Sequence, residues 1–172
     1  MNISIRHAHR TEASELSTIA KAAKKSWGYP DHWLELWSDS LNITPEFIEQ
    51  HNVWVATADK AIVGFVAIRI SNDTADVEHM WVTPPAMGQG VGKRLFYYCL
   101  DFCKTRHIKT LRIESDPNAR GFYEKFGAKQ TGEVPSTPAP RVLPVLAIPL
   151  TDTLNNTLTN TPADSQAQRR QT

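Results

Sequence analysis

The chain has 172 residues, enough for one domain of ordinary size and too few for two full domains. Apolar residues make up 41% and charged residues 22%, which is the composition of a globular protein rather than of a disordered or fibrous chain. The formal net charge of +1 excludes the strongly positive field with which proteins collect nucleic acid or anionic membranes. We therefore expect a small-molecule or protein partner, with no nucleic acid and no membrane.

Cysteine content and the lack of long apolar segments indicate the compartment. The two cysteines, Cys99 and Cys103, are too few for a disulfide framework and lie four residues apart, as two small buried side chains on one helical face would. No segment approaches the roughly 20 apolar residues that span a bilayer, and residues 1–10 lack the apolar stretch of a signal peptide. We predict a cytoplasmic protein.

Hydrophobic periodicity predicts the elements in the first half of the chain. A polar turn at Asp59-Lys60 between two apolar runs indicates an antiparallel hairpin. The next strand must leave the sheet at Pro84-Pro85, because proline cannot donate to a strand ladder. The predicted elements are a strand at 3–6, a helix ending before Gly28, a helix at 31–40 and strands at 53–58, 62–70 and 76–82.

The second half of the chain continues with alternating helices and strands up to residue 150. The predicted elements are a helix ending near Arg106, a strand at 111–114, a helix from Asp116 to Gly127 and a late strand at 142–148 interrupted at Pro144. The segment 151–172 has no aromatic residue and is predicted to be a disordered tail beside a domain of residues 1–150. This order predicts a single α+β domain with a mixed, mainly antiparallel sheet flanked by helices. An exposed strand at 142–148 would also allow a homodimer.

A glycine-containing loop, Met87 to Lys93, lies between a predicted strand and a predicted helix. Glycines let the backbone aim its N–H groups at one point, and a helix start adds partial positive charge, so the loop suits a phosphate group. A dinucleotide-binding fingerprint would need glycine at position 93, and a P-loop would need Ser or Thr where Arg94 stands. Both of these readings fail. A phosphate cradle of another kind and a plain turn at a helix entry both remain open.

This loop resembles the hallmark of the GNAT acetyltransferase superfamily, Arg/Gln-x-x-Gly-x-Gly/Ala, with Met87 in the place of Arg or Gln. A second segment, Asp116 to Ala128, is similar to the family's later motif, Asn-x-x-Ala-x-x-Phe/Leu-Tyr-x-Lys-x-Gly-Phe, with Asp116 in the place of Asn and Ala128 in the place of Phe. The element order from Ile3 to about Leu150 follows the family layout. The resemblance therefore implies the GNAT fold and acetyl-coenzyme A as acetyl donor, without a metal.

The resemblance also implies which residues bind the donor. Backbone amides of the glycine loop would hold its pyrophosphate, and the strand before the loop would pair with its pantetheine arm. Tyr123 would be the general acid that protonates the departing thiolate. The residues expected to bind the donor are Met80, Trp81, Val82, Met87, Gly88, Gln89, Gly90, Val91, Gly92, Lys93, Asp116, Asn118 and Tyr123.

A catalytic base is expected on the strand that leads into the loop, because a lysine-like amine is almost fully protonated at pH 7. Glu78 and His79 are the candidates. We favour Glu78, since strand alternation would place it on the same face as Met80 and Val82 unless a bulge intervenes. An ordinary edge carboxylate is the alternative.

The acceptor site is predicted among aromatic residues. Trp27, Tyr29 and Trp33 lie in a segment that covers the substrate entrance in this superfamily, and they would hold a planar or cationic acceptor or serve as packing. The predicted function is transfer of an acetyl group from acetyl-coenzyme A to a primary amine, on a small molecule or a peptide, by direct transfer in a ternary complex. The alternatives are a sensor that binds coenzyme A or an acyl-coenzyme A without catalysis, and a scaffold with a degenerate loop.

Overall fold

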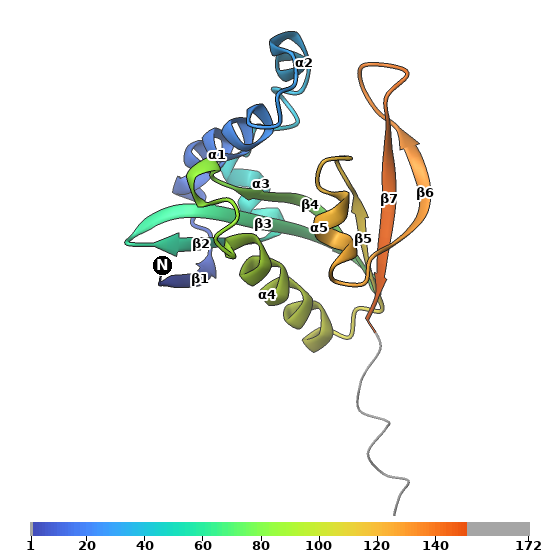
Figure 1. The fold of residues 1–172 in the computed structure, drawn as a ribbon. Helices are drawn as coiled ribbons and strands as arrows, with labels where there is room; N and C mark the ends of the chain where they lie inside the picture. The colour runs from blue at the N-terminus through green and yellow to red at the C-terminus, as the bar shows by residue number, and fades with distance from the viewer. Residues whose placement is uncertain (1, 151–172) are drawn as a thin grey trace, which may run out of the picture.

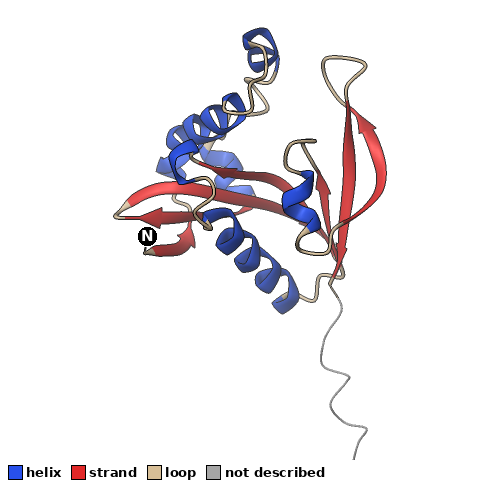
Figure 2. Ribbon diagram, in the orientation of Figure 1, coloured by secondary structure: helices blue, strands red, loops and turns tan. Residues whose placement is uncertain are grey.

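Seven strands form one sheet in the order β1-β2-β3-β4-β5-β7-β6 within residues 2–150, the part of the chain that this computed structural model describes (Figure 1). Helices cover both faces of the sheet (Figure 2). The predicted tail, 151–172, lies outside the described residues. The elements are β1 (Ile3–His7), η1 (Arg10–Glu12), α1 (Ala13–Lys25), α2 (Asp31–Leu36), α3 (Pro45–Gln50), β2 (Asn52–Ala58), β3 (Ala61–Ser71), β4 (Thr74–Val82), η2 (Pro84–Ala86), α4 (Val91–Thr105), β5 (Thr110–Glu114), α5 (Arg120–Glu124), β6 (Lys129–Pro135) and β7 (Val142–Pro149).

The sheet is mixed and mainly antiparallel, as predicted, because β4 and β5 are its one parallel pair among the described strands. That pairing covers only Thr74–Val77 of β4, whereas β4 continues to Val82. Beyond Val77 the two strands diverge, and β5, β7 and β6 run at a steep angle to β1–β4 (Figure 1). The divergence leaves the last residues of β4, after Val77, without a strand partner on the β5 side.

Two hydrophobic cores fill the two faces of the sheet. The first lies under α4 and α5 and contains Trp54, Leu95 and Phe96, and the second lies under α1 and contains Leu16 and Phe65. Cys99 and Cys103 are buried free thiols on the apolar face of α4, as the spacing predicts. Helices therefore pack on both faces of the sheet near the position at which β4 and β5 diverge.

The C-terminal half of the sheet differs from the prediction in two ways: it contains an additional strand, and that strand rather than β7 forms the edge of the sheet. The segment 129–135 forms β6, which alternation did not reveal, since all but one of its residues are exposed. Pro144 does not interrupt β7. It lies one residue past the last β5–β7 pair, where the N–H that proline lacks is not needed for pairing with β5. Its carbonyl accepts the Ser115 N–H at 2.9 Å. Since β7 lies between β5 and β6, it cannot serve as the exposed dimer edge that we expected.

Three helices also differ from the predicted ones. The helix predicted at 31–40 ends at Leu36. The short helix α3 was not predicted, although Thr44 caps it and Pro45 occupies its first turn, which is a recognisable start signal. The helix predicted from Asp116 begins only at Arg120, because the Asp116 carboxylate accepts the Asn118 N–H at 2.9 Å and holds a turn there.

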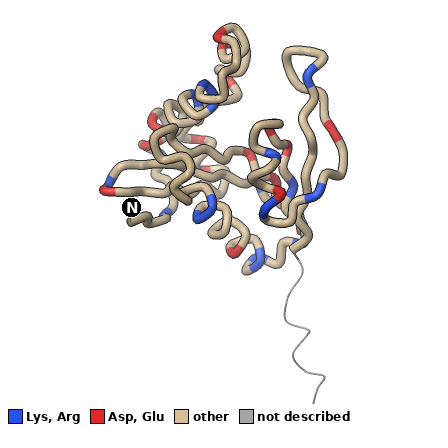
Figure 3. The backbone as a smooth tube through the Cα atoms, viewed as in Figure 1, with Lys and Arg blue, Asp and Glu red and all other residues tan. Residues whose placement is uncertain are grey.

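Charged residues of both signs are interspersed over the described backbone, and neither sign dominates a large part of it (Figure 3). This distribution agrees with the near-zero formal charge. None of the helices in residues 2–150 has the length and apolar character needed to cross a membrane.

Candidate active site

The glycine loop forms an open cradle of backbone N–H groups. Gly88 and Gly90 have φ angles of +75° and +82°, which side chains with a Cβ adopt only with strain. Gly90 caps α4, and the first helical bond runs from Arg94 N–H to the Gly90 carbonyl. The N–H groups of Val91, Gly92 and Lys93 therefore have no partner within the helix and face outward at its positive end. This is the arrangement that binds a phosphate or another anion.

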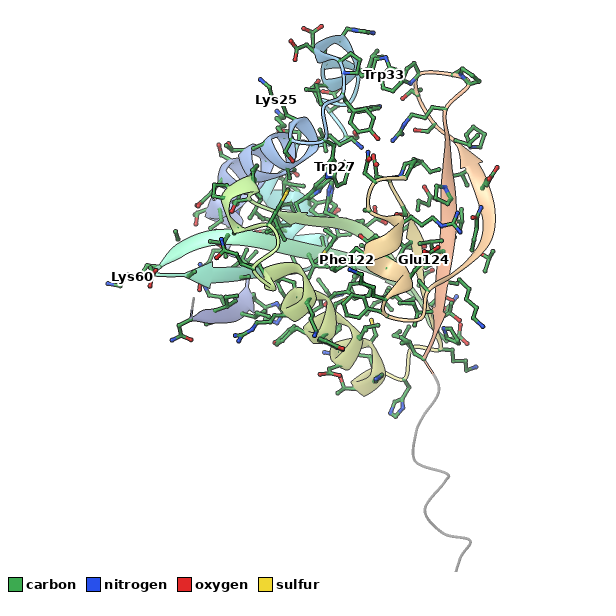
Figure 4. The ribbon with its side chains drawn as sticks, viewed as in Figure 1. Lys25, Trp27, Trp33, Lys60, Phe122 and Glu124 are labelled. Carbon is green, nitrogen blue, oxygen red and sulfur yellow. The ribbon has the colours of Figure 1, made fainter. Side chains whose placement is uncertain are left out.

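A first cavity, of about 620 Å³, extends from this loop along β4 to α5. Trp27, after α1, and Phe122, on α5, lie on its two sides (Figure 4). A Cβ on Gly92 would lie 3.4 Å from Phe122 Cε2 and 3.6 Å from Met80 Cε. A larger residue at position 92 would therefore occupy part of the first cavity. Lys93 and Lys125 add positive charge to the lining. The cavity thus joins a phosphate cradle to a long, mostly apolar groove.

The exposed backbone of β4 forms one wall of the first cavity. Thr83 N–H donates to the Val63 carbonyl of β3 at 2.9 Å. Backbone groups alternate in direction along an antiparallel strand, so those of Val82 and Met80 turn away from β3, to the side where β5 has diverged. A ligand that carries amide groups can pair with them as an added strand would.

Tyr123, on α5, reaches the first cavity from the buried side of the helix. It is 6% exposed, and the ring of Phe96 packs against it at 5.3 Å between centroids. Burial raises the pKa of the Tyr123 hydroxyl, and Cys99 and Asp116 act in the same direction. The hydroxyl therefore stays protonated throughout the neutral range, in the form that can donate a proton.

A second cavity, of about 410 Å³, lies on the other side of β4, and Trp81 lines both cavities. Its lining includes Trp37 from the segment after α2 and Ser136 from the connection between β6 and β7. Eight of its lining residues are charged: Lys24, Arg69, Asp76, Glu78, Arg112, Glu114, Asp116 and Arg141. The first cavity suits a long ligand with phosphates, whereas the second suits a polar one.

Glu78 lies in a bulge of β4, which changes the face that we predicted for it. The β3–β4 register moves from Ala67 with His79 to Ile68 with Val77, so Glu78 is the extra residue. Its carboxylate accepts from Arg69 Nε at 3.0 Å and lines the second cavity, not the first. The bulge therefore places Glu78 on the opposite face from the one that strict alternation predicts, although Glu78 still lies two to four residues from the exposed backbone of Met80 and Val82.

His79, the other candidate base, is held in the neutral form. Trp81 Nε1 donates to His79 Nδ1 at 3.1 Å, so the ring proton of neutral His79 is on Nε2. Burial lowers the pKa of His79 to about 4, with a smaller contribution from His51. The rings of Phe47 and Phe65 pack against it at 5.3 and 6.0 Å. An imidazole with its free lone pair already engaged and such a low pKa is a poor base.

The pKa of His79 predicts an acid limb of stability. In the unfolded chain His79 has an ordinary pKa near 6.5, so between pH 6.5 and 4 the unfolded state binds more protons and stability falls as the pH falls. The expected loss is on the order of 3 kcal/mol by pH 4. Urea denaturation of His79→Gln should show a shallower decline over this range than wild type. His32→Gln, which removes an exposed imidazole, is the control, and an equal decline in wild type and His79→Gln would contradict the prediction.

Asp116 is the centre of a buried ion-pair cluster that lines the second cavity. Its carboxylate accepts from Lys24 Nζ at 2.5 Å, from Arg141 Nη2 at 2.9 Å and from the Tyr29 hydroxyl at 2.9 Å. The side chains of Lys24, Asp116 and Arg141 are 10%, 8% and 11% exposed. We call these three residues the Asp116 cluster.

Two cations share one carboxylate in the Asp116 cluster, and the pKa shifts of Asp116 and Lys24 reflect this. Burial acts to raise the pKa of Asp116, but the hydrogen bonds from Lys24 and the Asn118 N–H outweigh it and the pKa is lowered. Burial lowers the pKa of Lys24, and Asp116 compensates only in part because Arg141 opposes it. Lys24 Nζ and Arg141 Cζ also lie 4.4 and 4.9 Å from the ring centroid of Trp37. The cluster carries an excess of one positive charge.

A second charge network crosses β3, β4 and β5 and also lines the second cavity. Arg69 contacts Asp76 at 3.4 Å and Glu78 at 3.0 Å, and Arg112 contacts Asp76 at 3.2 Å and Glu114 at 2.9 Å. These five residues, which we call the strand network, carry an excess of one negative charge. Within residues 2–150 no group of three or more His, Cys, Asp or Glu side chains is arranged to hold a metal ion.

Most of the residues predicted to bind the donor line the first cavity, and three do not. Gln89 Nε2 donates to the Pro85 carbonyl, the Val91 side chain is buried in the core although its N–H belongs to the cradle, and the Asp116 carboxylate lies in its cluster. The predicted residues that line the first cavity are Met80, Trp81, Val82, Met87, Gly88, Gly90, Gly92, Lys93, Asn118 and Tyr123.

The aromatic residues predicted for the acceptor have different positions. Trp27 lines the first cavity and packs against Trp81 at 5.7 Å between ring centroids. Tyr29 lies behind the second cavity, where its hydroxyl donates to Asp116. Trp33, on α2, lies outside both linings and packs against Tyr29 and against Trp37 at 5.7 Å (Figure 4). Trp33 is therefore a packing residue.

Lys24 and Arg141 line the second cavity but were not among the site residues predicted from the sequence. Lys24 had a signal, because it follows Ala20 by four residues on the apolar stripe of α1, where a charged residue needs a partner. Arg141 had none, since it stands in a proline-rich segment with no periodicity. Its partner Asp116 is 25 residues away in the chain.

Comparison with known proteins supports one family. A family model described as an acetyltransferase (GNAT) domain matches residues 19–136. The chain is 31% identical over 81 residues to a Bacillus subtilis (strain 168) protein whose name refers to alanine N-acetylation of ribosomal protein bS18. It is 30% identical over 91 residues to the peptidyl-lysine N-acetyltransferase YjaB of Salmonella typhimurium. The matched segments are 45% and 52% of this chain, and they span 54% and 59% of these relatives, little more than half their length.

Solved structures agree on the fold. PaiA N-acetyltransferase from Thermoplasma acidophilum, crystallised in complex with coenzyme A, superposes with a TM-score of 0.72 at 19% identity, covering 87% of this chain and 99% of that one. The family model matches more than half of the chain and includes both the glycine loop and the Tyr123 motif. The chain therefore belongs to the GNAT family of acetyltransferases.

Proposed function

We propose that the protein transfers an acetyl group from acetyl-coenzyme A to a primary amine by direct attack within a complex of both substrates. The observation that carries this proposal is the meeting of two cavities of different character at Trp81. The amide cradle and Lys93 suit a pyrophosphate, and the exposed backbone of Met80 and Val82 suits the amides of pantetheine. The donor would enter through the first cavity and the amine through the second.

The residues at this junction have complementary tasks in the proposed reaction. A C–N bond forms between the amine nitrogen and the acetyl carbonyl carbon, and the C–S bond of the thioester breaks. The Tyr123 hydroxyl gives its proton to the leaving sulfur and recovers one from solvent. Glu78 receives the surplus proton of the amine nitrogen, directly or through water, and the β4 backbone polarises the carbonyl. The products are an N-acetyl amine and free coenzyme A.

Thermal denaturation with candidate ligands tests the donor. Acetyl-coenzyme A and coenzyme A, each at about 100 times its dissociation constant, should each stabilise the fold by roughly 2.7 kcal/mol, and NAD should not. Free thiol should then be released when amines are added with acetyl-coenzyme A. Stabilisation without thiol release from any amine would favour the sensor. No stabilisation by either coenzyme would favour the scaffold.

A further inference from the structure

We propose that the acceptor is a small amine that also carries a carboxylate, with the carboxylate at Lys24 and Arg141 and the amino group toward Glu78. This inference rests on the proposed function and names the substrate class of the same site. The Asp116 cluster has one positive charge too many and the strand network one negative charge too many, and both line the second cavity. Such a cavity matches a zwitterion rather than a simple amine.

The Asp116 cluster has both the charge and the donors to bind a carboxylate. Asp116 cannot neutralise both Lys24 and Arg141, and both are about nine-tenths buried, where an uncompensated charge is costly. The ammonium of Lys24 has three donors, and one of them is used by Asp116. Arg141 uses Nη1 on Ser136 and Nη2 on Asp116 and the Tyr29 hydroxyl, while its Nε makes no hydrogen bond within the described residues. A ligand carboxylate would complete the charge balance.

The strand network has the opposite character, and it includes Glu78, the proposed base. Glu78 stands in the bulge directly before His79, Met80 and Trp81, and Trp81 lines both cavities. Arg69 and Arg112 are shared among the carboxylates of Asp76, Glu78 and Glu114, so these carboxylates are only partly neutralised. An ammonium group in the second cavity is therefore attracted toward Glu78, three residues before Trp81 on β4.

Contacts across the second cavity also favour a small acceptor over a polypeptide. Trp37 Nε1 donates to the Thr137 carbonyl at 2.8 Å, and Arg141 pairs with Asp116 beside Tyr29. These contacts tie the segment around α2 to the connection between β6 and β7. A chain extending from the amine in both directions would have to break them, whereas a small zwitterion would fit beneath them.

The test compares each common L-amino acid with its carboxamide as acceptor, using acetyl-coenzyme A and measuring free thiol. Wild type should prefer at least one free amino acid over its carboxamide by tenfold or more in kcat/KM. Arg141→Gln leaves the Lys24–Asp116 pair intact and should lower this preference roughly ten- to a hundredfold, the loss of a charge-assisted hydrogen bond. Arg141→Lys should retain most of it. Because the ratio is compared between variants, the intrinsic reactivity of the two amines cancels.

The matched control is Lys129→Gln, which removes a positive charge from the same hairpin at an exposed position outside the second cavity and should leave the ratio unchanged. Circular dichroism and the thermal shift with coenzyme A would verify that each variant is folded. The inference is overturned if wild type prefers carboxamides or peptides, or if Arg141→Gln leaves the ratio at the wild-type value. Thiol release from carboxamides alone would still uphold the proposed function. No thiol release from any amine, with coenzyme A bound, would overturn both.

Discussion

Replacement of Tyr123 by phenylalanine should reduce kcat by two to four orders of magnitude while leaving the affinity for coenzyme A near the wild-type value. The hydroxyl is the only group that the change removes, and the ring would keep its packing against Phe96 and Phe122. Without it, the departing thiolate must leave as an anion or take its proton from water. Steady-state thiol release measures kcat, and the thermal shift with coenzyme A measures retained binding.

Tyr98→Phe provides the matched control for this variant. Tyr98 lies on α4, packs against Trp54 and does not line the first cavity, so loss of its hydroxyl should leave kcat unchanged. If Tyr123→Phe retained wild-type kcat, Tyr123 would not be the acid. If its affinity for coenzyme A fell in parallel with kcat, the hydroxyl would be acting in binding rather than in proton transfer.

Replacement of Asp116 by alanine should destabilise the protein by about 3–5 kcal/mol. The change leaves Lys24 and Arg141 facing each other in a buried site without their shared carboxylate, and it removes the acceptor of the Tyr29 hydroxyl. It also releases the turn that the Asn118 N–H closes before α5. Urea denaturation at pH 7 measures the loss.

Glu124→Ala is the control for Asp116→Ala. Glu124 pairs with Arg120 at 2.5 Å on the surface of α5, with both side chains nearly half exposed, so its removal should cost only about 0.3–0.5 kcal/mol. Because the folded-state pKa of Asp116 is lowered, its contribution is complete above the unfolded pKa near 3.9 and is lost as the pH falls below it. Wild type and Asp116→Ala should therefore converge in stability under acid. Equal losses in Asp116→Ala and Glu124→Ala at pH 7 would show that the cluster does not stabilise the fold.

Features that depend on local patterns could be predicted without the fold. The glycine loop was identified from the spacing of Gly88, Gly90 and Gly92, because left-handed backbone and a helix start are encoded within a few residues. The mixed sheet flanked by helices was predicted from hydrophobic periodicity and from turn residues. The two motifs were sufficient to indicate the GNAT family, and Tyr123 was found as part of the second of them.

The positions of the polar side chains at the site depend instead on long-range contacts in the fold. The face of Glu78 depends on a bulge in the pairing of β4 with β3, which no local pattern along β4 reveals. The partners of Asp116 come from positions 92 residues before it and 25 residues after it in the chain, so its departure from the family's asparagine is explained only by the folded cluster. The second cavity likewise exists only where α1, β4 and the β6–β7 connection meet. Charge pairing acts through space, whereas periodicity records only the local backbone.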